Sequence, residues 1–377
     1  MACYQLYHES CCLALELQSA RMSNKTKLLS ALAAVILGGI LVYFLLFRHG
    51  LADREALLSS MPADAQSVLF VDLASLRGAP FFAELLAWAP KPEADPGYEQ
   101  FRRETGFDYE KDLDRVAVAF ERQGASQTFY AVMAGRFDRK KIIAYAAKSG
   151  TAAKLNGRDV FSVPVNGGAQ HLLLMFLSND LVALTNGNDL RPLLEKSSTS
   201  ENADWHTRFA RVAGSPLFLV VHNDGIHEAL AAPISQDSLA QRAAGGFTSP
   251  QLSSLLRQLQ WITIAGKPES DHLRIVAEGE SSDETNIHQL TELLNGVTLL
   301  ASAGLNNPKT RQQLPAATRD SYRDLLKSID VSRVDRGETK SVRLMFELSP
   351  QLLKAAQTAF PSPPPASTTP PTNKHTP

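Results

Sequence analysis

One uncharged apolar run, Leu28–Phe47, constrains this chain more than any other stretch. As a helix rising about 1.5 Å per residue it reaches about 30 Å, which is the thickness of a bilayer's hydrocarbon core. The residues after it have mixed polarity and end in a proline-rich tail. The sequence therefore predicts a transmembrane helix at Leu28–Phe47 that carries a folded domain on one side of a membrane.

The charges that flank this run predict its direction. Basic residues precede it, and the basic residues beyond it are soon followed by acidic ones: Arg21, Lys25 and Lys27 on one side, and Arg48, His49, Asp53 and Glu55 on the other. Basic flanks stay in the cytoplasm, so we expect a cytoplasmic N-terminus and an extracytoplasmic domain. The alternative is a cleaved signal peptide, but the run exceeds the usual core of about 7–15 residues and lacks a small-x-small site after it.

Residues 1–27 form a short N-terminal segment of unusual composition. All three cysteines, Cys3, Cys11 and Cys12, lie in it, and the rest of the chain has none. Met22 begins a basic lead of the kind that opens a signal anchor, so we interpret residues 1–21 as a mis-assigned start, with Met1 as the open alternative. A cysteine-free domain suits an oxidising compartment and has no thiol nucleophile or thiolate metal site.

Small residues recur every fourth position in the apolar run, at Ser30, Ala34 and Gly38. Such a stripe lets two membrane helices approach closely, which predicts a homodimer face. The alternative is that glycine and alanine are simply common in membrane helices.

Bulk charge excludes nucleic acid as an expected partner. The chain has 38 basic and 39 acidic residues, and no basic block stands out after the apolar run. Nucleic-acid binding requires a concentrated positive surface. We therefore expect the lipid bilayer and an envelope protein as partners.

The pattern after the apolar run predicts an α+β fold with antiparallel sheets. Short alternating apolar segments come in pairs joined by turn residues, as at Asn156-Gly157, and helical spacing separates the pairs. Paired strands between helices favour antiparallel pairing over a doubly wound sheet. The turn at 267–270 joins one such pair, and Ser281 with Glu284 has the spacing of a capping box before a long helix.

The same order of elements occurs twice, in halves that we expect at 61–196 and 203–360. Strands near Ser67 and Pro216, and hairpins near Arg115 and Gln260, are offset by about 145–150 residues. Weak identity between the halves leaves open that α+β chains commonly share such an order. Residues 361–377 hold many prolines and no large apolar residue, so we expect a disordered tail.

No catalytic motif is present, and the only histidine cluster is His222, Asp224 and His227 at the end of an expected strand. Histidine and aspartate can hold Zn²⁺, which would suit a metal-dependent hydrolase. The spacing crosses a turn and is not His-Glu-x-x-His, and Asp224 could equally cap the following helix. Acidic pairs such as Asp271 with Glu278 look like exposed residues. We expect no cofactor and no enzyme activity.

Four phrases between Met61 and Lys196 carry a resemblance: MPADAQSVLFVDLASLRGAP, ETGFDYEKDLDRVAVAF, LNGRDVFSV and SNDLVALTNGNDLRPLLEK. Together they resemble bacterial single-pass envelope proteins with a large extracytoplasmic α+β domain of unknown function. The resemblance implies a domain in the periplasm, held at the bacterial inner membrane, and it brings no active-site residues. The expected function is a membrane-anchored binding or scaffolding domain; the alternative is the hydrolase.

Overall fold

One antiparallel sheet contains all twelve strands that the computed structural model assigns in the described residues. The structure describes residues 54–88, 96–123, 126–165, 168–194, 200–231, 250–337 and 339–359. Leu57–Pro377 forms one compact unit. The predicted anchor, with Ser30, Ala34 and Gly38, and the tail at 361–377 lie outside the described residues. Among the helices that are described, none has both the length and the apolar content needed to cross a bilayer.

The first half of the unit alternates strand hairpins with short helices. In chain order its elements are β1 (Ser67–Asp72), α3 (Leu73–Arg77), α4 (Pro80–Trp88), α5 (Pro96–Thr105), α6 (Tyr109–Asp112), β2 (Leu113–Gln123), β3 (Ser126–Gly135), α7 (Arg139–Ser149), β4 (Thr151–Leu155), β5 (Arg158–Val165), β6 (Gln170–Phe176), β7 (Leu181–Thr185) and the 3-10 turn η2 (Arg191–Leu193).

The second half begins with a helix and then follows a similar order. Its elements are α8 (Ser200–Arg211), β8 (Leu217–His222), α9 (Asn223–Ala231), α11 (Pro250–Leu256), β9 (Trp261–Glu269), β10 (His272–Ser281), α12 (Glu284–Asn306), α13 (Pro308–Gln313), α14 (Ala316–Ser328), β11 (Asp330–Arg336), β12 (Thr339–Leu348) and α15 (Pro350–Ala359).

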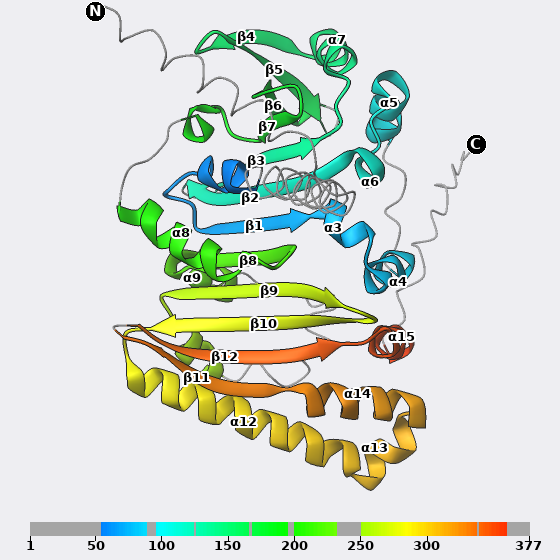
Figure 1. Ribbon diagram of the computed structural model, residues 1–377, viewed down its shortest axis with the longest axis vertical. Coiled ribbons are helices and arrows are strands. Elements are labelled where there is room, and N and C mark those ends of the chain that lie inside the picture. The colour runs from blue at the N-terminus through cyan, green and yellow to red at the C-terminus, as the bar shows by residue number, and fades with distance from the viewer. Residues whose placement is uncertain are drawn as a thin grey trace, which may run out of the picture. The chain divides into compact units, whose positions relative to one another are not determined.

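The two halves meet in the middle of the sheet, where β1 pairs with β8. The strand order is β11-β12-β10-β9-β8-β1-β2-β3-β7-β6-β5-β4 (Figure 1). The backbone N–H of Asp72 donates to Pro216 at 2.6 Å, and that of His222 donates to Gln66 at 2.8 Å. These reciprocal bonds extend both ends of the β1–β8 ladder in the same way. The halves predicted at 61–196 and 203–360 therefore share one continuous sheet.

Alternation along the strands places apolar side chains on both faces of this sheet. On one face Val68, Phe70 and Val220 are almost fully buried beneath α8 and the chain before β1. Phe70 also stacks on Phe218 across the joint, with ring centroids 5.2 Å apart. On the other face α9, α11 and α12 cover the second half, and α5 and α7 cover the first. The predicted α+β class with antiparallel pairing is confirmed.

Local patterns predicted the first hairpins well. Asn156 and Gly157 take positive φ values of 49° and 78° in the turn between β4 and β5, as that dipeptide favours. Asp138 caps α7 by accepting a hydrogen bond from the backbone N–H of Lys141 at 3.2 Å. β2 and β3 pair antiparallel, with Arg115 opposite Ala134, so the hairpin at Arg115 is confirmed, and α7 follows it.

Three local predictions were wrong. Asp283 caps α12, whereas Ser281 ends β10 and its hydroxyl accepts from the Asp283 backbone N–H at 3.1 Å. The turn after β9 lies at Ser270, which has a φ of 55°, so residues 267–269 stay in the strand. The sequence after Asp189 predicts a helix at 190–196, but its described residues form only the short turn η2, with Pro192 in its first turn.

Candidate functional site

Two of the three candidate metal ligands, His222 and Asp224, line one hollow near the pairing of β1 with β8. His222, the last residue of β8, faces Trp261 on the neighbouring strand with ring centroids 4.6 Å apart. Trp261 meets Trp205 of α8 edge-on at 4.8 Å. The hollow measures about 290 Å³ and is lined by Ala63, Asp64, Ala65, Gln66, Asp204, Trp205, His222, Asp224 and Trp261.

His227 does not join this hollow, because the sheet separates it from His222. His222 packs on Trp261, whose face of the sheet lies beneath α8, while α9 buries Ile226 on the opposite face. His227 is exposed on α9. No three His, Cys, Asp or Glu side chains in the described residues gather closely enough to hold a metal ion. The structure therefore does not assemble His222, Asp224 and His227 into a ligand set.

Asp224 is not the cap of α9 that the sequence suggested. The helix begins one residue earlier, at Asn223, and Asp224 lies exposed in its first turn. A carboxylate there still favours the helix, because the N-terminal end carries partial positive charge.

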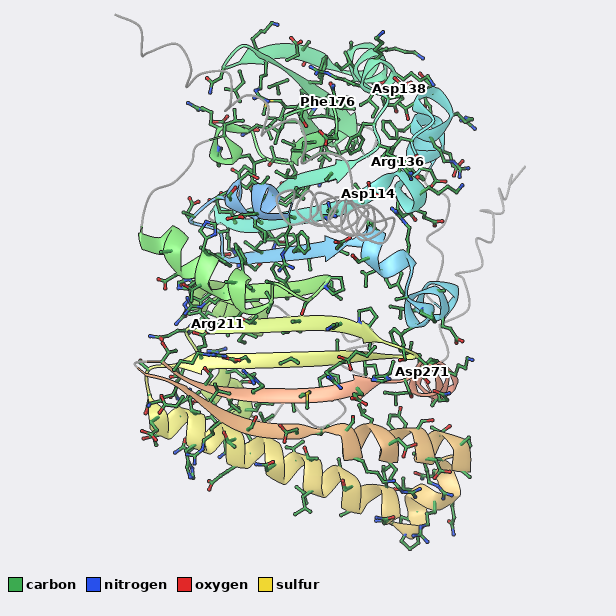
Figure 2. All side chains as sticks on the ribbon, in the orientation of Figure 1. Asp114, Arg136, Asp138, Phe176, Arg211 and Asp271 are labelled. Atoms are coloured by element: carbon green, nitrogen blue, oxygen red, sulfur yellow. The ribbon has the colours of Figure 1, made fainter. Side chains whose placement is uncertain are left out.

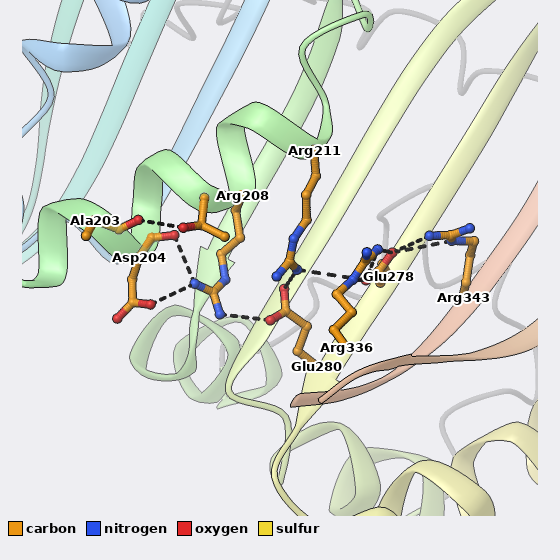
Figure 3. Close-up of polar contacts among 9 residues, drawn as sticks. Ala203, Asp204, Arg208, Arg211, Glu278, Glu280, Arg336 and Arg343 are labelled. Atoms are coloured by element: carbon orange, nitrogen blue, oxygen red, sulfur yellow. Dashed lines mark hydrogen bonds and ion pairs between the residues drawn. The ribbon is translucent and has the colours of Figure 1, made fainter. Parts of the chain in front are cut away.

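A buried ionic network borders the same tryptophan and is the most elaborate polar cluster of the described residues. Glu280 of β10 is fully buried and accepts hydrogen bonds from Arg208 at 2.8 Å and from Arg211 at 2.7 Å (Figure 3). Arg208 also lies over the Trp261 ring, with its guanidinium carbon 4.0 Å from the centroid. A second Arg208 nitrogen reaches the Asp204 carboxylate at 3.2 Å. α8 is thus fastened to the sheet by charge as well as by apolar packing.

Glu278 extends the network along β10 toward the edge of the sheet. It accepts hydrogen bonds from Arg336 of β11 and Arg343 of β12, each at 3.0 Å. Burial alone would raise the pKa of Glu278, but the hydrogen bonds from Arg336 and Arg343 outweigh it and lower that pKa below 4.5. The carboxylate stays ionised and fully engaged, so it acts structurally and is not poised to transfer a proton.

The prediction that Asp271 and Glu278 are exposed is confirmed for Asp271 and wrong for Glu278. Glu278 is 8% exposed, and Asp271 lies at the β9–β10 turn, the opposite end of that hairpin from Arg211 (Figure 2). The ion pairs of Glu278 depend on the register between β10 and β12, which the sequence alone does not give. Glu278 stands directly opposite Arg343, and Arg274 stands opposite Glu347. Alternating charges on two strands indicate cross-strand ion pairs once the register is known.

A larger and more polar hollow lies in the first half, beside the end of β7. It measures about 840 Å³ and is lined by Gln127, Thr128, Tyr130, Ser162, Ala169, Gln170, His171, Leu173, Asn186, Gly187, Asn188 and Asp189. None of these residues was predicted to form a site. Amide and hydroxyl side chains predominate in the lining, and we call it the polar hollow.

The end of β7 shapes the polar hollow. Asn186 continues the β7 edge with its side chain, accepting from the Phe129 backbone N–H at 2.8 Å and donating to the Gln127 carbonyl at 3.2 Å. Gly187 then passes so close to Thr128 that a Cβ would lie 2.8 Å from its methyl group. The loop after Thr185 is therefore held firmly against β3.

Two titratable groups of the polar hollow, Tyr130 and Asp189, already interact with neighbouring side chains. Burial, the charge of Glu121 and that of Asp64, and a hydrogen bond to Glu121 raise the pKa of Tyr130 to about 12. Asp189 is ion-paired with Arg191. Apart from His171, the remaining polar side chains of the lining are amides and hydroxyls, which suit hydrogen bonding to a polar ligand.

No family model matches the chain, and no curated protein matches it. Among solved structures the chain is similar to TP0453 in its crystal form III, at 10% identity and a TM-score of 0.41, over 81% of this chain and 98% of that one. Crystal form IV gives 10% identity and a TM-score of 0.40, over 80% and 96% of the two chains. Crystal form I gives 10% identity and 0.39, over 81% and 97%. Structural similarity at this level supports no statement about the function of this chain.

Proposed function

We propose that this protein is a binding or scaffolding domain of the bacterial cell envelope, anchored in the inner membrane by Leu28–Phe47 and exposed on the periplasmic side. The charge-free length of that segment and the basic residues before it support the anchor and its direction. The resemblance of Met61–Lys196 to single-pass envelope proteins agrees with both. The bilayer is then one partner, and an envelope component is the other.

The observation that carries the binding role is the chemistry of the polar hollow. Its volume of about 840 Å³ is in the range of small-molecule and peptide sites. Gln127, Gln170 and Asn188 present amides, while Tyr130 and Asp189 are already engaged by neighbouring side chains. Such a lining offers hydrogen bonds to a neutral polar chain, such as an extended peptide or a glycan.

Photo-crosslinking in intact membranes tests this role. Benzoylphenylalanine placed at Gln170 in the full chain lies on the lining of the polar hollow, whereas at Lys140 it lies exposed on α7. We expect a discrete light-dependent adduct from position 170 that position 140 does not give. Identical patterns at the two positions would contradict a ligand in the hollow.

The second candidate is a metal-dependent hydrolase, which one observation favours: His222 and Asp224 line the same hollow beside Trp261. Metal analysis of the purified full chain decides between the two. Stoichiometric Zn²⁺ that disappears on His222→Ala would favour the hydrolase over the binding domain. Zinc content equal in the wild type and in His222→Ala would remove this candidate.

We also propose that the halves at 61–196 and 203–360 descend from one duplicated unit. β1 and β8 share the same sequence of buried and half-buried positions. In each half a hairpin follows, then a helix capped by an aspartate, Asp138 or Asp283. The last strand of each half then pairs with the third strand of that half. An experimental structure in which β1–β3 and β8–β10 do not superpose would contradict the duplication.

A further inference from the structure

Two leucines on α12 stand out because they face solvent. Leu299 and Leu300 are each 72% exposed, by far the largest exposure of any large apolar side chain in the described residues. Earlier in the same helix, Ile287 and Leu290 are each 1% exposed against the sheet. α12 therefore changes along its length from a buried core helix to one with an uncovered apolar face.

Small residues extend this exposed face. Gly296, Ala303 and Gly304 lie three or four positions from Leu299 or Leu300, so all five share one side of the helix. A Cβ built at Gly296 or at Gly304 meets nothing within 4 Å. We call these five residues the α12 face: they form a smooth apolar strip with free space in front of it.

The stretch of chain that contains the α12 face carries no acidic residue. Between Glu292 and Asp320 no acidic residue occurs, and the charged residues in this stretch are Lys309, Arg311 and Arg319. Lys309 and Arg311 are exposed on α13, which follows α12 at the same end of the fold (Figure 1). Arg319 donates to the Arg311 carbonyl at 3.0 Å. On neighbouring α14, Asp320 and Asp324 pair with Arg323 and Lys327, so Lys309 and Arg311 leave a positive balance beside the exposed leucines. Exposed leucines beside a positive balance of charge are the pattern of surfaces that rest on anionic membranes.

We propose that the α12 face docks on the anionic lipid surface of the membrane that anchors the chain, with Leu299 and Leu300 entering the headgroup region and Lys309 and Arg311 meeting lipid phosphates. A second copy of the chain fits less well, because a stable dimer buries about 1,200–2,000 Å² and five residues, three of them small, supply far less. A lipid surface needs no such area when an anchor already holds the chain nearby. The inference therefore rests on the proposed anchoring.

Lipid-borne quenching in vesicles tests the docking with the full chain. Cys3, Cys11 and Cys12 are replaced by serine, and an environment-sensitive fluorophore is attached to Leu300→Cys or, as a matched control, to Lys140→Cys on exposed α7. Each protein is reconstituted with spin-labelled lipid, either in phosphatidylcholine alone or in equal parts phosphatidylcholine and phosphatidylglycerol. Vesicle flotation at alkaline pH reports the anchor separately.

We expect quenching at position 300 in the anionic vesicles and little at position 140. Neutralising Lys309→Gln or Arg311→Gln is expected to lower the ratio of docked to free fluorophore about fivefold each, since a cation near an anionic surface contributes about 1 kcal/mol. A chain that floats but shows no quenching at position 300 overturns the docking and leaves the anchor standing. Cross-linking between copies through position 300, without lipid quenching, overturns it in favour of a dimer. A chain that does not float refutes the anchor and the docking together.

Discussion

Removing the charge of Glu280 is expected to destabilise the domain strongly. The Glu280 carboxylate is fully buried, and its partner Arg208 is only 6% exposed. Each arginine–carboxylate attraction contributes about 4 kcal/mol at 4 Å when the effective dielectric constant is about 20. In Glu280→Gln the amide oxygen still accepts a hydrogen bond from a charged donor, which returns about 1.5–3 kcal/mol. Arg211 is about one-quarter exposed and is partly resolvated.

The remaining loss comes from Arg208, whose guanidinium stays buried beside Trp261 and keeps only the solvent-exposed Asp204 carboxylate as a counter-charge. Breaking one side of a buried ion pair costs about 3–5 kcal/mol, and we expect Glu280→Gln to lower the free energy of unfolding by about that amount. Replacing both partners, as in Arg208→Met with Glu280→Leu, is expected to restore most of the stability, because no buried charge is then left unpaired.

Urea unfolding of the full chain in mild detergent, followed by tryptophan fluorescence, measures this effect. Trp205 and Trp261 pack around the network and report its loss directly. With a slope near 3 kcal/mol per molar urea, the midpoint should fall by about 1 M or more. Glu104→Gln is the matched control, because Glu104 pairs with Lys148 at 3.0 Å on the surface. Equal midpoints for Glu280→Gln and Glu104→Gln would refute the reasoning.

Three further predictions concern pH and packing. Because the folded-state pKa of Tyr130 is raised from 10.0 to about 12, its stabilising contribution is present below pH 10 and is lost as pH rises through about 12. Phenolate absorbance should show a tyrosine that titrates near pH 12, and Tyr130→Phe should remove it. Because the pKa of Glu278 is lowered below 4.5, its contribution is present above pH 4.5 and is lost as pH falls through the folded value; the wild type should lose stability in acid more steeply than Glu278→Gln in a pH series of urea midpoints. A Cβ at Gly150 would overlap the Ser162 carbonyl, so Gly150→Ala should cost about 1–3 kcal/mol in urea unfolding, whereas Gly214→Ala, with open space, should not; equal midpoints would contradict the close approach.

Local patterns predict the hairpins of this fold but not its centre. The alternation in β2 and β3 and the Asn156-Gly157 turn are short-range signals, and the structure confirms both. The β1–β8 pairing joins segments far apart in the chain, and no turn residue marks such a contact. β11 was not predicted, because its sequence, Asp-Val-Ser-Arg-Val-Asp-Arg, is polar on an edge strand and lacks an apolar stripe.

Long-range contacts also explain why the buried ionic network was not predicted. Glu278 was predicted to be exposed and no role was predicted for Glu280, because their arginine partners come from α8, β11 and β12, far away in sequence. For the histidine cluster the error was the opposite, because closeness in sequence suggested a site that the fold does not assemble. His222 and His227 are close in sequence, but the strand ends between them and the helix passes to the other face of the sheet. Closeness along the chain is a poor guide to a site wherever a strand gives way to a helix.

A topology reporter tests the central proposal most directly, because the envelope location and the lipid docking both depend on a domain held outside the cytoplasm by Leu28–Phe47. Alkaline phosphatase fused after Phe360 folds into an active enzyme only outside the cytoplasm, and β-galactosidase at the same position is active only inside. We predict phosphatase activity without galactosidase activity, retained in the membrane fraction after alkaline extraction. Galactosidase activity alone would contradict the account.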